Sequence, residues 1–269
     1  MNEASYTYAV ARIRANEPGL LGAADMEQLL SAPDLAAAES LLSARGYDLS
    51  QGLDAALRAR TAQAWRLITE ILPRPGELDF LVVKNDFHNL KARLKAMFAH
   101  GAPRAPLLSP TAFGDGEIAA LVEARRFGGL PECMAGCAQE AYDLLARTMD
   151  GHLADTAVDR QCLATIPAMA RATGSEFLLG LAETMCASIG RAAELRAQHK
   201  SSAAFEKQCD DALIEYALPA KWKHFGVEPV AAYWLAREAE VKNVRIAMAC
   251  RRNGVPAEEI RERVRLLYV

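Results

Sequence analysis

Aromatic residues and strand-forming patterns are both scarce in this sequence. Phe, Trp and Tyr make up 7% of the 269 residues, and Val, Ile and Thr are seldom clustered. No run of alternating apolar and polar residues is long enough to predict a β-strand. The dominant residues are alanine, leucine, glutamate and arginine, which favour helix. The composition therefore predicts an all-α protein, and its 51% of hydrophobic residues is enough for a full core.

Long hydrophobic runs are absent as well. Nowhere do about 20 apolar residues follow one another, so the sequence predicts no transmembrane helix. The first residues, MNEASYTYAV, carry an acid at position 3 and lack the basic and apolar regions of a signal peptide. We expect a cytoplasmic protein that is neither secreted nor membrane-spanning, and that would act at a membrane only through protein partners.

An excess of positive charge is also missing. The formal net charge is −3 and the isoelectric point is near 6.0, whereas nucleic-acid-binding domains usually carry a basic excess on one face. The segment KWKHFG, residues 221–226, does combine bases with aromatics, but no wider basic stripe surrounds it. We therefore expect Trp222 and Phe225 to pack inward, and we expect no nucleic-acid partner.

Signatures of catalysis or of a cofactor are weak. The Gly128-Gly129 pair lacks the Lys and the Ser or Thr of a phosphate-binding loop, so we expect no nucleotide site. A loose group of metal-binding residue types comprises Cys133, Cys137, His152 and Cys162. Structural zinc usually has two short pairs of ligands, and the six cysteines fit better as small core residues in a reducing compartment. The sequence predicts no catalytic residue, cofactor or metal.

Helical spacing of apolar residues dominates the chain. A long helix is predicted over 53–72 and a second over 76–98, antiparallel to the first because their connection is short. The stretch 101–116 holds three prolines and three glycines and is the best linker in the sequence. Beyond it, helices are predicted at about 115–126, 131–155, 157–173, 175–199, 204–217, 227–252 and 256–267.

One short pattern occurs twice. Residues 86–91 read DFHNLK and residues 240–245 read EVKNVR, so each has an acid, two variable positions, Asn, an aliphatic residue and a base. Both copies lie near the middle of a long predicted helix. The repeated residues are Asp86, Asn89 and Lys91 in the first copy, and Glu240, Asn243 and Arg245 in the second. Internal repetition predicts a symmetric or solenoid-like helical architecture.

The second copy shares a helix face with small residues, which would let another helix approach closely. A buried acid on such a face needs hydrogen bonds or a cationic partner. We therefore interpret Glu240 and Asn243 first as a polar clasp between repeat units, and second as a contact with a partner protein. General acid–base catalysis is disfavoured, because no second titratable group converges on either carboxylate.

Four stretches of the chain resemble a known family. They are YTYAVARIRANEPGLL with the following LLSARGYD, then DFHNLKARLKAM, then GSEFLLGLAETM with LRA after it, and finally YWLAREAEVKNVRIAMACRRNGVPAEEIRERV. Together they resemble, in order and over most of the chain, the C subunit of V-type (A/V-type) ATP synthases. That subunit is the counterpart of subunit d of the eukaryotic vacuolar ATPase.

The resemblance implies an all-helical funnel of three similar units, here approximately 1–100, 115–200 and 204–269 within one domain. The middle unit is degenerate, since its ETMCASIGRAAELRA segment lacks the acid and the Asn. The N-terminal helix would pack on the C-terminal unit.

In function, the resemblance implies a non-catalytic central-stalk rotor subunit. Its partners would be the membrane proteolipid ring and the central shaft, and it would couple the rotation of one to that of the other for ion transport. Two other classes stay open at this point. One is a helical-repeat adaptor that binds an unrelated protein in a groove, and the other is a metal- or thiol-dependent helical enzyme that uses the cysteine and histidine group. The coupling ion and the direction of the reaction cannot be read from the sequence.

Overall fold

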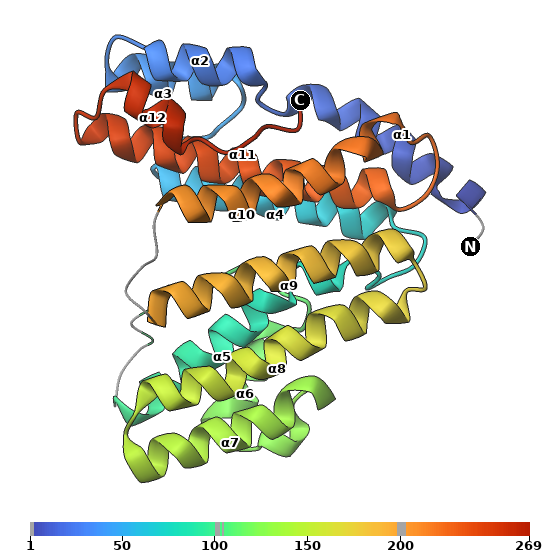
Figure 1. Ribbon diagram of the computed structural model, residues 1–269, viewed down its shortest axis with the longest axis vertical. Coiled ribbons are helices and arrows are strands. Elements are labelled where there is room, and N and C mark those ends of the chain that lie inside the picture. Colours follow the sequence, from blue (N-terminus) through green and yellow to red (C-terminus); the bar gives the residue numbers. More distant parts are fainter. Residues whose placement is uncertain (1–2, 100–102, 104, 198–202) are drawn as a thin grey trace. The chain divides into compact units, whose positions relative to one another are not determined.

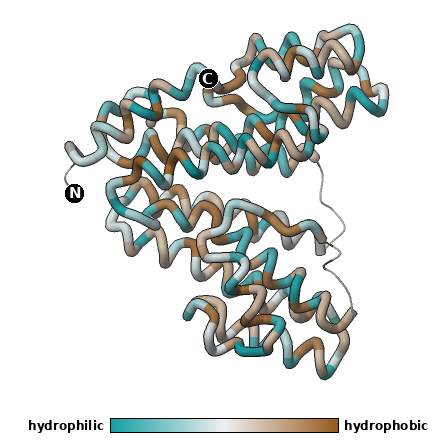
Figure 2. The backbone as a smooth tube through the Cα atoms, turned by 180° about the vertical axis from the view of Figure 1, so that it is seen from behind, coloured by the Kyte–Doolittle hydropathy of each residue, from teal (hydrophilic) through white to brown (hydrophobic). Residues whose placement is uncertain are grey.

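The computed structural model describes residues 3–99, 103, 105–197 and 203–269. In these ranges every regular element is a helix, and there is no strand. Hydropathy alternates along most of the helices, as expected where one face is buried and the other is solvated (Figure 2). The prediction of an all-α fold is confirmed. No helix in the described ranges combines the length and the apolar composition that a membrane span requires.

The chain divides into two compact units. The terminal unit comprises Met1–Pro75 and Ala187–Val269, and the central unit comprises Gly76–Cys186. The boundary falls within helix α9, Glu176–Ala197. Each unit therefore forms its own core, and one copy of the repeated acid-x-x-Asn pattern lies in each.

The terminal unit is built around α11, Glu228–Arg252, whose buried residues lie on nearly all of its faces. It packs against helices from both ends of the chain (Figure 1). Trp234 of α11 is fully buried and meets Trp65 edge to face, with ring centroids 4.8 Å apart. The helices around it are α1, Thr7–Asn16; α2, Ala23–Ser31; α3, Leu35–Ala44; α4, Leu53–Ile71; α10, Ala203–Ala217; and α12, Ala257–Arg263.

The central unit is organised around α5, Val83–Phe98, which contacts each of the other complete helices of this unit. These are α6, Asp115–Glu123; α7, Glu132–Thr148; and α8, Gly151–Ala172. A short connection joins α7 to α8, and the two helices lie side by side (Figure 1). The core of the unit includes the fully buried side chains of Phe87 and Leu90.

Several predicted helices have different bounds in the structure. The last one, predicted over 256–267, ends at Arg263. The helix predicted over 76–98 begins at Val83, because residues 79–81 form a 3₁₀ turn, η3, Asp79–Leu81. The single helix predicted over 131–155 is wrong. Met149 adopts a left-handed conformation with φ 56°, and Asp150 caps a new helix by accepting from the backbone N–H of His152 at 2.8 Å. The Asp150-Gly151 pair was the available signal for this break.

The end of α9 can be compared only in part, because residues 198–199 of the helix predicted over 175–199 lie outside the described residues. The linker predicted over 101–116 is irregular where it is described, up to the start of α6 at Asp115.

Candidate functional site

Asn243 lies completely buried in the middle of α11. It binds one residue of the chain that follows α12, residues 264–269, which we call the C-terminal segment. Its Nδ2 donates to the carbonyl of Arg265 at 3.0 Å, and its Oδ1 accepts from the backbone N–H of Arg265 at 2.7 Å. Both peptide groups of a residue beyond α12 are thus satisfied by one side chain. Because buried backbone groups need partners, this amide pins the extended chain after α12 onto α11.

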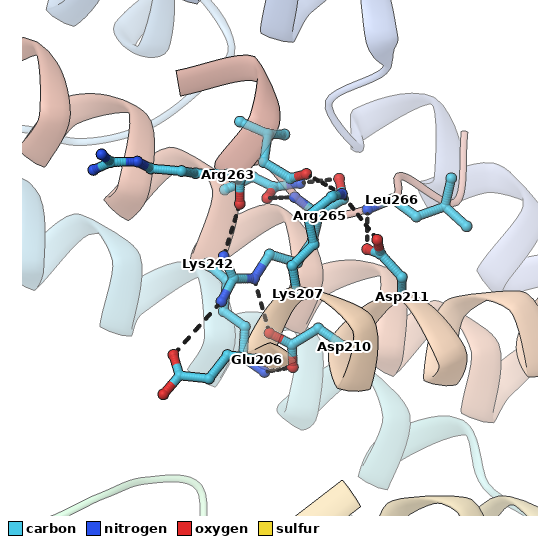
Figure 3. Close-up of polar contacts among 10 residues, drawn as sticks. Glu206, Lys207, Asp210, Asp211, Lys242, Arg263, Arg265 and Leu266 are labelled. Atoms are coloured by element: carbon cyan, nitrogen blue, oxygen red, sulfur yellow. Dashed lines mark hydrogen bonds and ion pairs between the residues drawn. The ribbon is translucent and has the colours of Figure 1, made fainter. Parts of the chain in front are cut away.

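The same segment is also bound by acids of α10 (Figure 3). Asp210 accepts from Arg265 Nε at 2.9 Å and from Lys242 Nζ at 2.5 Å, so it connects the segment with α11. Asp211 accepts from the backbone N–H of Leu266 at 2.5 Å. The C-terminal segment is therefore held between α10 and α11 by both backbone and side-chain bonds.

Glu240, one turn before Asn243, is also buried and fully bonded. Its Oε2 accepts from the backbone N–H of Leu21 at 2.7 Å, and its Oε1 accepts from Tyr47 Oη and from Arg237 Nη1. Burial and the neighbouring Glu240 carboxylate raise the pKa of Tyr47 above its ordinary value, so its hydroxyl keeps the proton that it donates. Glu240 thereby links α11 to the residues before α2 and after α3.

The first copy of the pattern makes the same amide contact in the central unit. Asn89 donates from Nδ2 to the carbonyl of Leu108 at 2.9 Å, and its Oδ1 accepts from the N–H of the same residue at 2.7 Å. Asp86 accepts from the backbone N–H groups of Ala112 at 2.8 Å and Phe113 at 3.1 Å. In both copies, then, the Asn binds both peptide groups of one residue that follows its helix in the chain.

The environment of Asp86 perturbs its ionisation. Burial raises the pKa of this carboxyl to about 6, although the two backbone N–H donors favour the charged form and oppose the shift. Glu240, by contrast, has a guanidinium partner in Arg237. The two acids occupy equivalent sequence positions but are stabilised differently.

Two further side chains of α5 bind the same linker, and neither was predicted from the sequence. Asn85 donates to the carbonyl of Pro110 at 2.7 Å, and His88 Nε2 lies 3.1 Å from the carbonyl of Pro106. Together with Asp86 and Asn89 they bond α5 to the residues that precede α6. The signal was present in the run NDFHN, where four polar residues lie within one and a half turns of a helix.

The basic residues that end each pattern pair with neighbouring helices. Lys91 Nζ lies 2.5 Å from Asp159 of α8, and Arg245 Nε lies 3.6 Å from Asp54 of α4. The second pair is exposed, and such surface pairs contribute little to stability. That the six residues of the two patterns join repeat units or contact a partner stays a prediction.

The cysteines lie apart from any metal-binding geometry in the described part of the chain. No group of three His, Cys, Asp or Glu side chains there is placed to hold a metal ion. Burial raises the pKa of Cys137 to about 11 and that of Cys162 to about 12, so both thiols stay protonated at neutral pH.

The prediction that Trp222 and Phe225 pack inward is wrong. In the connection between α10 and α11, Trp222 is 81% exposed and Phe225 is 51% exposed. The reason is a long-range contact: Arg14 Nη2 of α1 donates to the carbonyls of Ala220 at 2.9 Å and Lys221 at 2.8 Å. The same nitrogen also donates to the carbonyl of Lys223 at 2.9 Å. These bonds fix the backbone of residues 220–223 on α1, and the two aromatic side chains are left outside. We call residues 220–225 the aromatic loop.

Comparison with known proteins gives one family. The sequence model of the ATP synthase (C/AC39) subunit family matches residues 9–197 and 167–263, which together cover most of the chain. No curated protein matches the chain significantly. Both acid-x-x-Asn patterns lie within the matched residues. The chain therefore belongs to the ATP synthase (C/AC39) subunit family, whose members are subunits of rotary V-type ATPases.

Proposed function

We propose that this protein is the non-catalytic central-stalk subunit of a V-type ATPase or ATP synthase. It would sit on the membrane proteolipid ring, receive the central shaft and transmit rotation between them during ion transport. The family match over most of the chain carries the proposal. The helical fold supports it, because a body that transmits torque needs long helices with well-packed contacts.

We infer further that the fold descends from three similar helical units arranged as a funnel, with the middle unit degenerate. The support comes from the hydrogen bonds of the two Asn side chains as well as from their sequence positions. Asn89 and Asn243 lie at equivalent positions and bind the two peptide groups of Leu108 and Arg265, respectively, in the same way. Two unrelated sites would have little reason to share a bidentate amide contact at the same place in a repeated sequence pattern.

The buried polar contacts of α11 would suit a rotor, because they would stiffen the terminal unit internally. A net contribution of about 1 kcal/mol is typical for one buried hydrogen bond, and removing one partner leaves a buried group unsatisfied at a greater cost. Asn243, Glu240 and Asp210 together connect α11 with α10, with the C-terminal segment and with the chain near α2. Under load these connections would resist separation of the helices.

The aromatic loop is the surface that we assign to a partner subunit of the complex. Trp222 and Phe225 are large and exposed, and Trp is enriched among the residues that dominate binding at protein interfaces. Because Arg14 already holds the loop backbone, binding would cost little additional ordering. An interface of this kind would be preorganised.

Co-purification from native membranes tests the proposal. A tagged chain should retain the proteolipid ring and the central-shaft subunits, and the double substitution Trp222→Ala with Phe225→Ala should reduce that retention severalfold. Leu153→Ala, at an exposed apolar position of α8, is the matched control and should leave retention unchanged. Isolation with a single unrelated soluble protein, and without ring or shaft, would favour the helical-repeat adaptor instead.

A further inference from the structure

A polar cavity of about 270 Å³ opens in the terminal unit among α1, α4 and α11. Its lining is rich in side chains that donate hydrogen bonds. The charged and amide residues most relevant to binding are Arg12, Arg60, Gln63, Arg66, Glu70 and Arg237. Four of these six are arginines, and one is an acid.

Helical spacing explains why these residues meet at one cavity. Arg12 and Asn16 are one turn apart on α1, and Tyr233 and Arg237 are one turn apart on α11. On α4, residues 60, 63, 67 and 70 recur at intervals of three or four and so share a face. Three helices therefore present one polar face each to the same space.

The positive charge at this cavity is largely unbalanced. Arg12 donates to the hydroxyl of Tyr8 at 3.0 Å and Arg60 donates to the carbonyl of Arg45 at 2.7 Å, both neutral acceptors. Arg66 has no side-chain partner in the ranges that the structure describes, and none of these three arginines has a carboxylate partner there. Among the described residues, Glu70 is the one acid that lines the cavity.

Arg60 is held in place at this cavity. Its guanidinium donates to the carbonyl of Arg45 and lies over the Tyr47 ring, whose centroid is 4.7 Å away. Arg237 is likewise held in place, by its bond to Glu240.

We propose that this cavity binds a phosphate group, supplied either as free phosphate or a small phosphomonoester, or by a phospholipid headgroup. A carboxylate is satisfied by one bidentate arginine, whereas a phosphate offers acceptors in several directions and suits guanidinium groups from different helices. Arg60 and Arg237 form the fixed part of the site. Arg12 and Arg66, which are exposed, complete it from the rim.

Calorimetric titration of the full chain with inorganic phosphate, at constant ionic strength against chloride, tests the site. We expect saturable binding of one phosphate per chain, weakened at least tenfold by Arg66→Ala. Arg58→Ala is the matched control, because Arg58 is an exposed arginine on the same helix that does not line the cavity. No saturable binding by the wild-type chain, or equal binding by Arg66→Ala and wild type, would overturn the proposal.

The source of the phosphate is distinguished by two further ligands. Glycerol 3-phosphate should compete with inorganic phosphate if the ligand is a soluble ester. Vesicles of phosphatidylcholine with phosphatidic acid should bind the chain through Arg66 if the ligand is a headgroup, and pure phosphatidylcholine vesicles should not. Either binding result supports a phosphate site. Neither result depends on whether the chain is a rotor subunit.

Discussion

The amide of Asn243 satisfies two buried peptide groups, and its loss should be costly. Replacement of Asn243 by Leu keeps the volume but leaves the N–H and the carbonyl of Arg265 without partners. We expect the free energy of unfolding to fall by about 3 kcal/mol, since each unsatisfied buried group costs about 1–3 kcal/mol. Asn89→Leu should have a similar effect, because Asn89 makes the same contact with Leu108.

Urea unfolding of both variants measures this effect. Asn253→Ala serves as the control, because Asn253 is an exposed residue just past α11 whose side chain bonds only one carbonyl of its own helix. Unchanged stability in Asn243→Leu would show that the buried amide is not a structural clasp.

The carboxyl of Asp86 should make stability depend on pH in an unusual direction. Its pKa in the folded protein is raised to about 6 by burial, whereas an Asp in an unfolded chain has a pKa of about 3.9. Between these values the folded state binds more protons than the unfolded state, so the contribution of Asp86 to stability falls as pH rises from about 4 to about 6.

The comparison of wild type with Asp86→Asn isolates this contribution. The difference in unfolding free energy, wild type minus variant, should decrease over that pH window and level off above it. A difference that grows with pH would mean that the two backbone N–H donors outweigh burial and lower the pKa of Asp86.

At the scale of elements, Arg14 determines the conformation of the aromatic loop. Arg14→Met removes the donor to the carbonyls of Ala220, Lys221 and Lys223. Charge-assisted bonds of this kind contribute about 1.5 kcal/mol or more, so local opening should increase about tenfold. Limited trypsin digestion should then cleave after Lys221 and Lys223 about tenfold faster, because cleavage follows the population of the open form.

Arg12→Met is the control for the loop experiment, since Arg12 lies on the same helix and bonds Tyr8 rather than the loop. Equal cleavage rates in wild type and Arg14→Met would show that the loop is held by other contacts.

Some elements could be predicted from the sequence more accurately than others. The long helices α4 and α11 were predicted almost to the residue, because apolar spacing and flanking Pro and Gly residues are local signals. The position of the aromatic loop was not, because it depends on an arginine more than 200 residues away. The hydrogen-bond partners of Asn89 and Asn243 could not be predicted from the sequence either, since nothing local indicates which later peptide group an amide will bind.

At the scale of the whole molecule, four stretches of the sequence indicated the family, two of which contain the repeated pattern, and no catalytic signature was needed. The acid-x-x-Asn residues were selected because they occur twice, and the structure shows that both Asn side chains bind peptide groups in the same manner. The polar cavity among α1, α4 and α11 was not predicted, because its residues come from three separate segments and form no sequence motif.

The central claim is that this protein couples the membrane ring to the shaft of a rotary ATPase. ATP-driven ion uptake by membrane vesicles, with the chain first removed and then added back, tests it most directly. We predict that removal abolishes ion uptake while the catalytic head continues to hydrolyse ATP, and that the purified chain restores uptake. Ion uptake that persists at its full rate in vesicles lacking the chain would contradict this account.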